Sequence, residues 1–180
     1  MVAIICLLRG VNLGGHKPVK MDVLRALCDS LGLCNPQTHV QSGNVVFTCK
    51  ERSLPALTKK LEAAIEKKFG FHSDIILRTT PELKDVVARN PFAGRKNIEP
   101  SKLIVTFLAD EPGPEIAKAL SEIKGHPEEI HIRGREVYVY YPDGMGRSKL
   151  VPVLTKALKN VGTARNWNTV TKLLEMSENV

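Results

Sequence analysis

Hydrophobic and polar positions in the first half of the chain alternate in blocks typical of strands and helices. Residues 2–8 form a continuous apolar run, as in a strand buried on both faces. Apolar side chains recur at helical spacing over 20–33 and 53–69, while residues 37–49 hold two short strand-like runs. The run over 73–79 is a further strand. The order is βαββαβ, which is the ferredoxin-like unit.

The second half repeats most of this pattern. A helix over 81–90 ends at Asn90-Pro91, because the residue before a proline disfavours helical backbone. The next elements are a strand over 102–109, a helix over 113–123, a hairpin over 128–141 and a helix over 148–161. No closing strand is evident, and the spacing over 166–176 predicts a final helix.

These elements predict an α+β fold. It is a tandem of two ferredoxin-like (βαββαβ-type) halves, the second with a C-terminal helix in place of the last strand. The predicted halves cover residues 1–79 and 80–180 and meet near residues 79–101. We expect them to pack together as one body.

Composition narrows the class of protein without indicating a function. The chain has 180 residues, of which 43% are hydrophobic and 25% are charged, as in ordinary globular proteins. No apolar run approaches the roughly 20 residues that span a bilayer, and "MVAIICLLRG" lacks the features of a signal peptide. We therefore expect a cytoplasmic protein with no membrane partner.

Basic residues exceed acidic ones, 26 against 19, which gives a formal net charge of +7. This excess favours an anionic partner, which is a small anionic molecule, a nucleotide or a nucleic acid. A basic surface that only keeps the protein in solution accounts for the same numbers.

The sequence contains no recognisable metal or catalytic motif. The histidines show no HxxxH or HExxH spacing, no two cysteines form CxxC, and the acids lie mainly on predicted helix faces. We expect reduced core thiols at Cys6, Cys28, Cys34 and Cys49. We assign no metal, cofactor, nucleophile or base, and the sequence leaves open whether the protein is an enzyme.

The segment "LLRGVNLGGHKPVKM" is a glycine-rich turn between a strand and a helix. Gly10 and Gly15 have the spacing of a Walker A loop, but His16 separates Gly15 from Lys17, and Pro18 stands where the hydroxyl should be. The backbone N–H groups of such a turn and the positive potential of a helix start still suit an anion. A turn that only needs glycine at positive φ is the simpler explanation.

The segment "PDGMGRSKLVP" is a second turn of this kind. Arg147 and Lys149 place two cations beside the Ser148 hydroxyl, and arginine grips a phosphate or carboxylate through two hydrogen bonds. Ser148 is equally suited to cap the following helix. Adjacent helical side chains point about 100° apart, so we do not expect Ser148 and Lys149 to form a catalytic pair.

The segment "GTARNWNTV" is the third polar turn before a helix. Asn166 or Asn168 caps that helix, and Trp167 fits its apolar stripe. Together with Arg165, the two amides offer hydrogen bonds to a polar ligand.

The segment "QSGNVVF" predicts a tight turn at Gly43-Asn44 followed by a strand. An RNA-recognition fold would place aromatic side chains on its two central strands to stack bases. Phe47 is the lone aromatic residue here, so this interpretation has little support.

Five segments together resemble the bacterial domain-of-unknown-function family 1697: "LLRGVNLGG", "QSGNVVF", "NPF", "GMGRSKL" and "TARNWNTVTKLLEM". The resemblance covers nearly the whole chain in the expected order. It implies a duplicated ferredoxin-like α+β protein and no established activity, substrate or cofactor. The signature polar positions are Arg9, Asn12, Gln41, Ser42, Asn44, Arg147, Ser148, Lys149, Arg165, Asn166 and Asn168. The family varies over "GGHKPVKM", which weakens a ligand role for His16 and Lys17.

We expect a site for a phosphate-bearing or otherwise anionic small ligand where the three glycine-rich or polar turns meet. Its predicted residues are Arg9, Gly10, Asn12, Gly14, Gly15, Ser42, Asn44, Gly146, Arg147, Ser148, Lys149, Arg165, Asn166 and Asn168. One alternative is nucleic-acid binding through a basic surface. Another is a structural or protein-interaction module, in which the signature residues only cap helices and close turns. The oligomeric state is not predicted.

Overall fold

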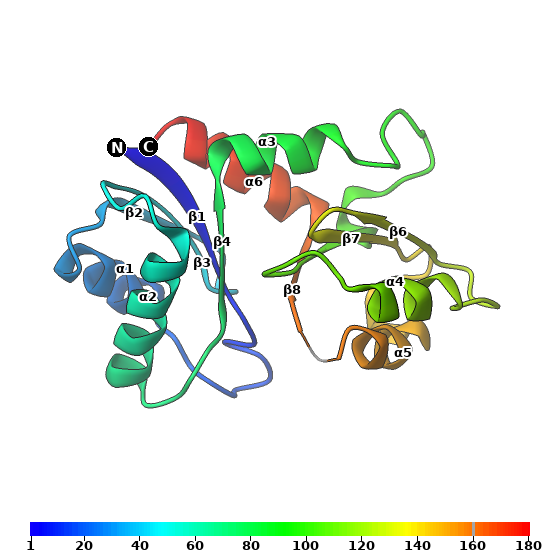
Figure 1. Cartoon of the computed structure of the whole chain (residues 1–180), viewed down its shortest axis with the longest axis horizontal. Helices are drawn as coiled ribbons and strands as arrows, with labels where there is room; N and C mark the ends of the chain where they lie inside the picture. Colours follow the sequence, from blue (N-terminus) through cyan, green and yellow to red (C-terminus); the bar gives the residue numbers. More distant parts are fainter. Residues whose placement is uncertain (160) are drawn as a thin grey trace. The chain divides into compact units, whose positions relative to one another are not determined.

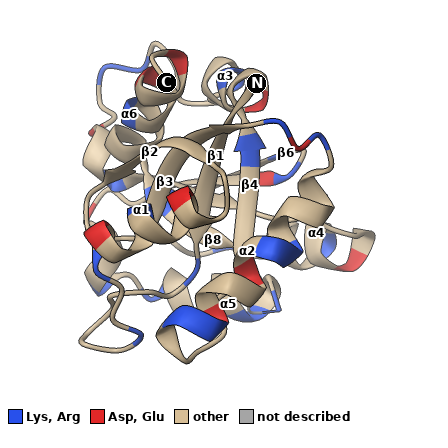
Figure 2. Ribbon diagram, turned by 90° about the vertical axis from the view of Figure 1, so that its left-hand side faces the viewer, with Lys and Arg blue, Asp and Glu red and all other residues tan. Residues whose placement is uncertain are grey.

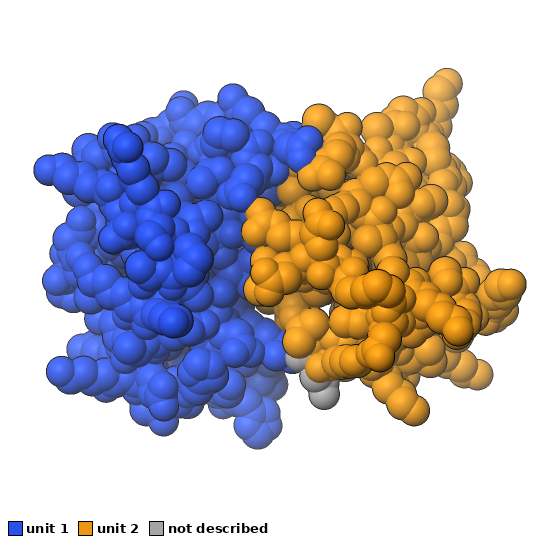
Figure 3. Space-filling model, viewed as in Figure 1, with its two compact units in different colours: residues 1–85, 171–180 blue, residues 86–170 orange. Residues whose placement is uncertain are grey.

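The structure, a computed structural model, describes residues 1–159 and 161–180. The chain divides into two units (Figure 3). Unit 1 consists of Met1–Asp85 together with Thr171–Val180, and unit 2 consists of Val86–Val170. Asn160, which falls within the predicted helix over 148–161, lies outside the described residues.

Unit 1 is built on an antiparallel sheet with two helices on one face (Figure 1). Its strands are β1 (Val2–Leu8), β2 (Cys34–His39), β3 (Asn44–Cys49) and β4 (Ile75–Thr79), in the spatial order β2-β3-β1-β4. The helices are α1 (Met21–Ser30) and α2 (Leu54–Phe69). The predicted βαββαβ order of this half is therefore confirmed.

The core of unit 1 follows from the alternation of side chains along its strands. Ile4, Cys6 and Leu8 of β1 point to the helices, where they join a buried cluster that includes Leu24 of α1. The intervening Ile5 is equally buried on the opposite face of the sheet. Both faces of β1 are thus covered, as its continuous apolar run predicts.

Unit 2 has the same architecture, with two helices on one face of an antiparallel sheet (Figure 1). Its strands are β5 (Leu103–Phe107), β6 (Glu129–Arg133), β7 (Glu136–Tyr140) and β8 (Thr163–Asn166), in the spatial order β6-β7-β5-β8. Its helices are α4 (Pro114–Ser121) and α5 (Leu150–Ala157), and short 3₁₀ turns are η1 (Pro100–Lys102) and η2 (Met145–Arg147).

The strand β8 corrects the prediction that a C-terminal helix replaces the last strand of the second half. Thr163–Asn166 pair antiparallel with β5, and Val105 lies opposite Arg165. This strand lacks an apolar pattern in the sequence because most of its residues are polar. The Arg165 residue is nevertheless only 8% exposed. The tandem of two α+β halves is confirmed, and each half completes its βαββαβ order before a further helix begins.

Those further helices are α3 (Thr80–Ala88) and α6 (Trp167–Glu178). The start of α3 carries a capping box, in which the Thr79 amide donates to Glu82 Oε2 at 2.7 Å and the Glu82 amide donates to Thr79 Oγ1 at 3.4 Å. At the start of α6, Asn166 Oδ1 accepts the Thr169 amide at 2.9 Å. Asn166 is therefore the cap of α6.

The last turns of α6 belong to unit 1, where they contact the start of α3. Thr80 Oγ1 donates to the Ser177 carbonyl oxygen at 3.3 Å, and Lys84 Nζ lies 2.8 Å from Glu178 Oε1. Unit 1 is thus assembled from two stretches of chain that are far apart in sequence. None of the described helices is long and apolar enough to cross a membrane.

The cysteines differ in environment, and the expectation of four core thiols is wrong for one of them. Cys6, Cys28 and Cys49 are buried free thiols, whereas Cys34 is exposed because it begins the edge strand β2. Burial and the nearby Asp29 carboxylate raise the pKa of Cys28 to about 12. That thiol therefore stays protonated and serves as a small apolar core residue.

Candidate functional site

Three loops of unit 1 meet at one end of its sheet. They cover residues 9–20, 40–43 and 70–74. Because β1 runs antiparallel to β3 and β4, its end lies beside the starts of both strands, with Leu7 opposite Asn44 and Leu8 opposite Ile75. This end of the sheet holds the predicted residues Arg9, Gly10, Asn12, Gly14, Gly15, Ser42 and Asn44.

Asn12 braces two of these loops. Its Nδ2 donates to the carbonyl oxygens of Val19 at 2.9 Å and Gln41 at 2.7 Å. Its Oδ1 accepts the Val19 amide at 2.8 Å. The Asn12 side chain therefore holds the glycine-rich turn to the β2–β3 turn. The backbone of Asn12 has a positive φ of +55°.

The β2–β3 turn is fixed by Asn44 and Gly43. Asn44 is fully buried and donates to the His39 carbonyl oxygen at 3.0 Å and to Ser42 Oγ at 2.8 Å. Gly43 has a φ of +72°, and a Cβ there would lie 2.6 Å from Val11 Cγ2. Glycine is required because the two loops approach each other more closely than a side chain allows.

Opposite charges from the first and third loops are paired. Arg9 Nη1 lies 3.0 Å from Asp74 Oδ2, and His72 Nε2 lies 3.1 Å from Asp74 Oδ1. Hydrogen bonding to Asp74 raises the pKa of His72. Burial raises the pKa of the Asp74 carboxyl, but hydrogen bonds from His72 and Arg9 outweigh it and hold that pKa below its ordinary value. Lys17 Nζ donates to the His72 carbonyl oxygen at 2.7 Å, so both cations have partners within the loops.

We expect the two histidines His72 and His39 to titrate on opposite sides of the ordinary histidine pKa of about 6.5. His39 lies below it because of burial and the positive charge of Lys172. The Asp74→Asn change should lower the pKa of His72 and leave that of His39 in place. Proton NMR of the imidazole rings across pH measures both values.

The ion pair between His72 and Asp74 depends on pH. Since the folded-state pKa of His72 is raised, its ion pair with Asp74 is fully formed below the unfolded pKa and is lost as the pH rises through the folded one. An unchanged His72 titration in the Asp74→Asn variant would contradict this pairing.

Glu62, His72 and Asp74 are the potential metal ligands that lie together, with side-chain atoms within 4.8 Å of one another in the described part of the chain. Protein donors already serve this cluster. Arg9 donates to Asp74, and the Ile75 amide donates to Glu62 Oε1 at 3.1 Å. We therefore assign no metal to it.

The glycine-rich turn also presents backbone amides to solvent. Gly10, Gly14 and Gly15 have φ values of +66°, +54° and +81°. Within the described chain their amides find no acceptor, and the last two residues are exposed. Such amides suit an anion, and water satisfies them equally well.

The second predicted turn connects β7 to α5 in unit 2 and contains Gly146 in η2. Ser148 Oγ accepts the Leu150 amide at 3.0 Å and donates to Glu128 Oε1. The side chains of Arg147 and Lys149 are exposed and form no ion pair among the described residues. The two cations are thus available to a ligand, while the serine hydroxyl already has a donor and an acceptor.

The duplication extends to this turn. Residues 52–61 read "RSLPALTKKL", and residues 147–158 read "RSKLVPVLTKAL". In unit 1 the corresponding serine, Ser53, accepts the Ala56 amide at 3.4 Å and caps α2. Helix capping is therefore the role that the two serines share.

The third predicted turn contributes an arginine that faces inward. Arg165 Nη1 donates to Thr163 Oγ1 at 2.8 Å and to the Ala164 carbonyl oxygen at 2.7 Å. Ala164 packs against the α4 and α5 cluster, so Arg165 lies on the other face of the sheet. Arg78 on β4 repeats this arrangement in unit 1, where it donates to the Leu77 carbonyl oxygen at 2.9 Å.

The three turns belong to different units. The first lies in unit 1, and the other two leave the same end of the unit 2 sheet, because Tyr140 and Asn166 both lie beside the start of β5. Asn168 is exposed on the first turn of α6. A single site built from all three turns stays a prediction.

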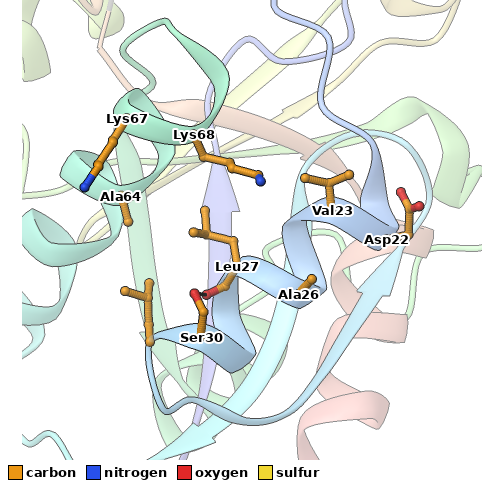
Figure 4. A pocket seen from close by; sticks show the side chains of 9 residues that line it. Asp22, Val23, Ala26, Leu27, Ser30, Ala64, Lys67 and Lys68 are labelled. Atoms are coloured by element: carbon orange, nitrogen blue, oxygen red, sulfur yellow. Dashed lines mark hydrogen bonds between the residues drawn. The ribbon is translucent and has the colours of Figure 1, made fainter.

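A groove between α1 and α2 was not predicted from the sequence. Its volume is about 680 Å³ (Figure 4). It is lined by Asp22, Val23, Ala26, Leu27, Ser30, Leu31, Ala64, Lys67 and Lys68. One signal could have indicated it: the apolar stripe of α1 is wider than its core-facing side, since Leu24 and Cys28 are buried while Val23 and Leu27 are only half-buried.

Comparison with known proteins identifies the family. The chain is similar to the conserved bacterial protein SP0830 from Streptococcus pneumoniae, with 21% sequence identity, a TM-score of 0.80 and 98% of each chain covered. No curated protein matches the chain. The family model described as "Protein of unknown function (DUF1697)" matches residues 1–138. The resemblance drawn from the five signature segments is thereby confirmed, and the chain belongs to the DUF1697 family.

Proposed function

We propose that this protein binds a small anionic molecule with an apolar part in the groove between α1 and α2. The observation that carries the proposal is the composition of the groove. Its volume of about 680 Å³ falls within the roughly 300–1,000 Å³ typical of small-molecule sites. Its lining is mostly aliphatic, with a few polar groups at the rim, which is the usual pattern of such sites.

The charges at the rim favour an anion at one end. Lys67 and Lys68 lie in the last turn of α2, and Asp22 lies in the first turn of α1. In Figure 4 the ammonium group of Lys68 extends over the groove toward Val23, whereas that of Lys67 points away. Lys68 is therefore the cation that would meet a carboxylate, sulfonate or phosphate, with the apolar part of the ligand over Leu27.

The proposed ligand is anionic, as the net charge of +7 favours, but it binds in the groove rather than at the glycine-rich turn. The glycine-rich turn leads directly into α1, but its Arg9 and Lys17 are paired within the loops. The groove instead combines an unpaired lysine with apolar surface, within the described residues. Such a combination selects amphipathic anions over inorganic phosphate.

Fluorescence titration with 1-anilinonaphthalene-8-sulfonate, an apolar anion, tests this proposal. We expect saturable binding that decanoate displaces and decanol displaces less well. Lys68→Glu should weaken binding about tenfold, because a lost charge pair near a protein surface is worth one to a few kcal/mol. Ala64→Phe should abolish binding, because its ring would fill the groove.

Matched controls lie on the same helix. Lys59 and Ala63 are exposed and do not line the groove. Lys59→Glu and Ala63→Phe should bind like the wild type. Equal effects in the test and control variants, or an absence of saturable binding, would overturn the proposal.

Nucleic-acid binding and a protein-interaction role remain the alternatives from sequence. Figure 2 shows basic and acidic segments interspersed over the elements that face the viewer. Binding to a nucleic acid would appear as an affinity that falls steeply with salt concentration. A cytoplasmic location belongs to the same proposal and stays a prediction.

A further inference from the structure

A buried carboxylate lies directly behind Ser148. Glu128 comes just before β6, and its side chain is only 6% exposed. Its Oε1 accepts the Ser148 hydroxyl, and its Oε2 is buried with no hydrogen-bond partner among the described residues. A buried acceptor without a partner costs about 1–3 kcal/mol, and more when it is charged. An unsatisfied buried group in a native protein requires an explanation, and a catalytic role is one of those known.

The Ser148 hydroxyl donates to a carboxylate that is shielded from solvent. A hydroxyl that donates to an adjacent general base is the arrangement of an activated nucleophile. His126 Nδ1 lies 3.9 Å from Glu128 Oε2, which is beyond hydrogen-bond distance. Ser148 itself is half-buried and so is within reach of a substrate.

The duplicated unit supplies a natural comparison. Ser53 caps α2 as Ser148 caps α5, which requires only that each hydroxyl oxygen accept a backbone amide. Near Ser53, Glu51 Oε1 accepts the Ser53 amide at 2.7 Å rather than its hydroxyl. Capping therefore does not account for the carboxylate behind Ser148.

We propose that Ser148 is a nucleophile for acyl transfer, with Glu128 as its general base. The exposed Arg147 and Lys149 on either side indicate an activated ester that carries an anionic group.

Apart from the ester, the reaction requires only water. Ser148 Oγ attacks the ester carbonyl carbon, and its proton passes to Glu128 Oε1. The bond from carbon to the leaving oxygen breaks, and that oxygen takes the proton from Glu128. Water then attacks the acyl-serine and gives a proton to Glu128, which returns it to Ser148 as the carboxylic acid departs.

An alkyl fluorophosphonate tests this proposal, since it forms an Oγ–P bond and releases fluoride. We expect one adduct per full-length chain, located on Ser148 by peptide mass spectrometry. Ser148→Gly should remove it, while Ser53→Gly should leave it unchanged; glycine is chosen because it costs a helix cap only a few tenths of a kcal/mol. Glu128→Gln should slow labelling about 100-fold or more, since it keeps an acceptor for the hydroxyl and removes the base.

An adduct elsewhere, no adduct, or a rate in Glu128→Gln equal to that of the wild type would overturn the proposal. The result is separate from groove binding, because Lys68→Glu should not change the labelling rate.

Discussion

Replacing Gly43 by alanine is expected to destabilise unit 1 by about 3 kcal/mol. An L-residue at its φ of +72° costs about 1–2 kcal/mol in backbone strain. The new Cβ would also lie 2.6 Å from Val11 Cγ2 and 2.8 Å from Leu8 Cβ. Overpacking of this kind adds about 1–3 kcal/mol, because both neighbours are buried and have little room to move. Equilibrium urea unfolding followed by circular dichroism measures the loss.

Gly15→Ala is the matched control for this substitution. Gly15 has a φ of +81°, but a Cβ there would meet no atom within 4 Å. The control variant should therefore lose only about 1–2 kcal/mol, from backbone strain alone. Equal losses in the two variants would show that loop contact at Gly43 contributes nothing, contrary to the close approach of the two loops.

Phe47→Ala is expected to have the largest effect on stability, a loss of about 3–5 kcal/mol. Phe47 lies in the middle of β3, is fully buried, and belongs to the cluster between the unit 1 sheet and its two helices. Truncation removes aromatic surface from the core and leaves a cavity that neighbours in regular strands and helices fill poorly. Urea unfolding again measures the change.

Phe71→Ala provides the comparison for that result. Phe71 packs against the same cluster from the loop before β4 but is only partly buried, with Lys17 Nζ 5.7 Å from its ring centroid. Its loss should cost less than half as much, because the loop can relax and water already reaches the ring. A Phe71→Ala variant as unstable as Phe47→Ala would contradict the placement of the core at β3.

Much of the architecture could be predicted because unit 1 and most of unit 2 obey simple periodicity. Apolar runs and helical stripes locate the strands and helices that bury them. The strand β8 was missed because Thr163, Arg165 and Asn166 are polar, and the burial of Arg165 depends on hydrogen bonds that periodicity does not describe. The return of Thr171–Val180 to unit 1 has no sequence signal either, since it depends on contacts with α3.

For the candidate sites, too, the sequence indicates polar residues at turns but not the contacts that these residues make. The predicted ligand contacts Arg9, Asn12 and Asn44 lie at one end of the unit 1 sheet, where their hydrogen-bond partners show that they brace loops. The groove was missed because its volume depends on the separation of two helices. The two acids Glu128 and Glu129 look alike in sequence, and only the register of β6 places one behind Ser148 while the other pairs with Arg95 at the surface.

The return of the chain to its first unit fixes an order of events during synthesis on the ribosome. The contact between Thr80 and Ser177 spans 97 positions, and the whole of unit 2 is translated between its two partners. While unit 2 is being synthesised, nascent unit 1 therefore lacks the contacts that the end of α6 makes with the start of α3. Its last contacts close across a long loop, which is entropically costly and slow. The contacts between α3 and α6 can thus form only after the whole of unit 2 has been made.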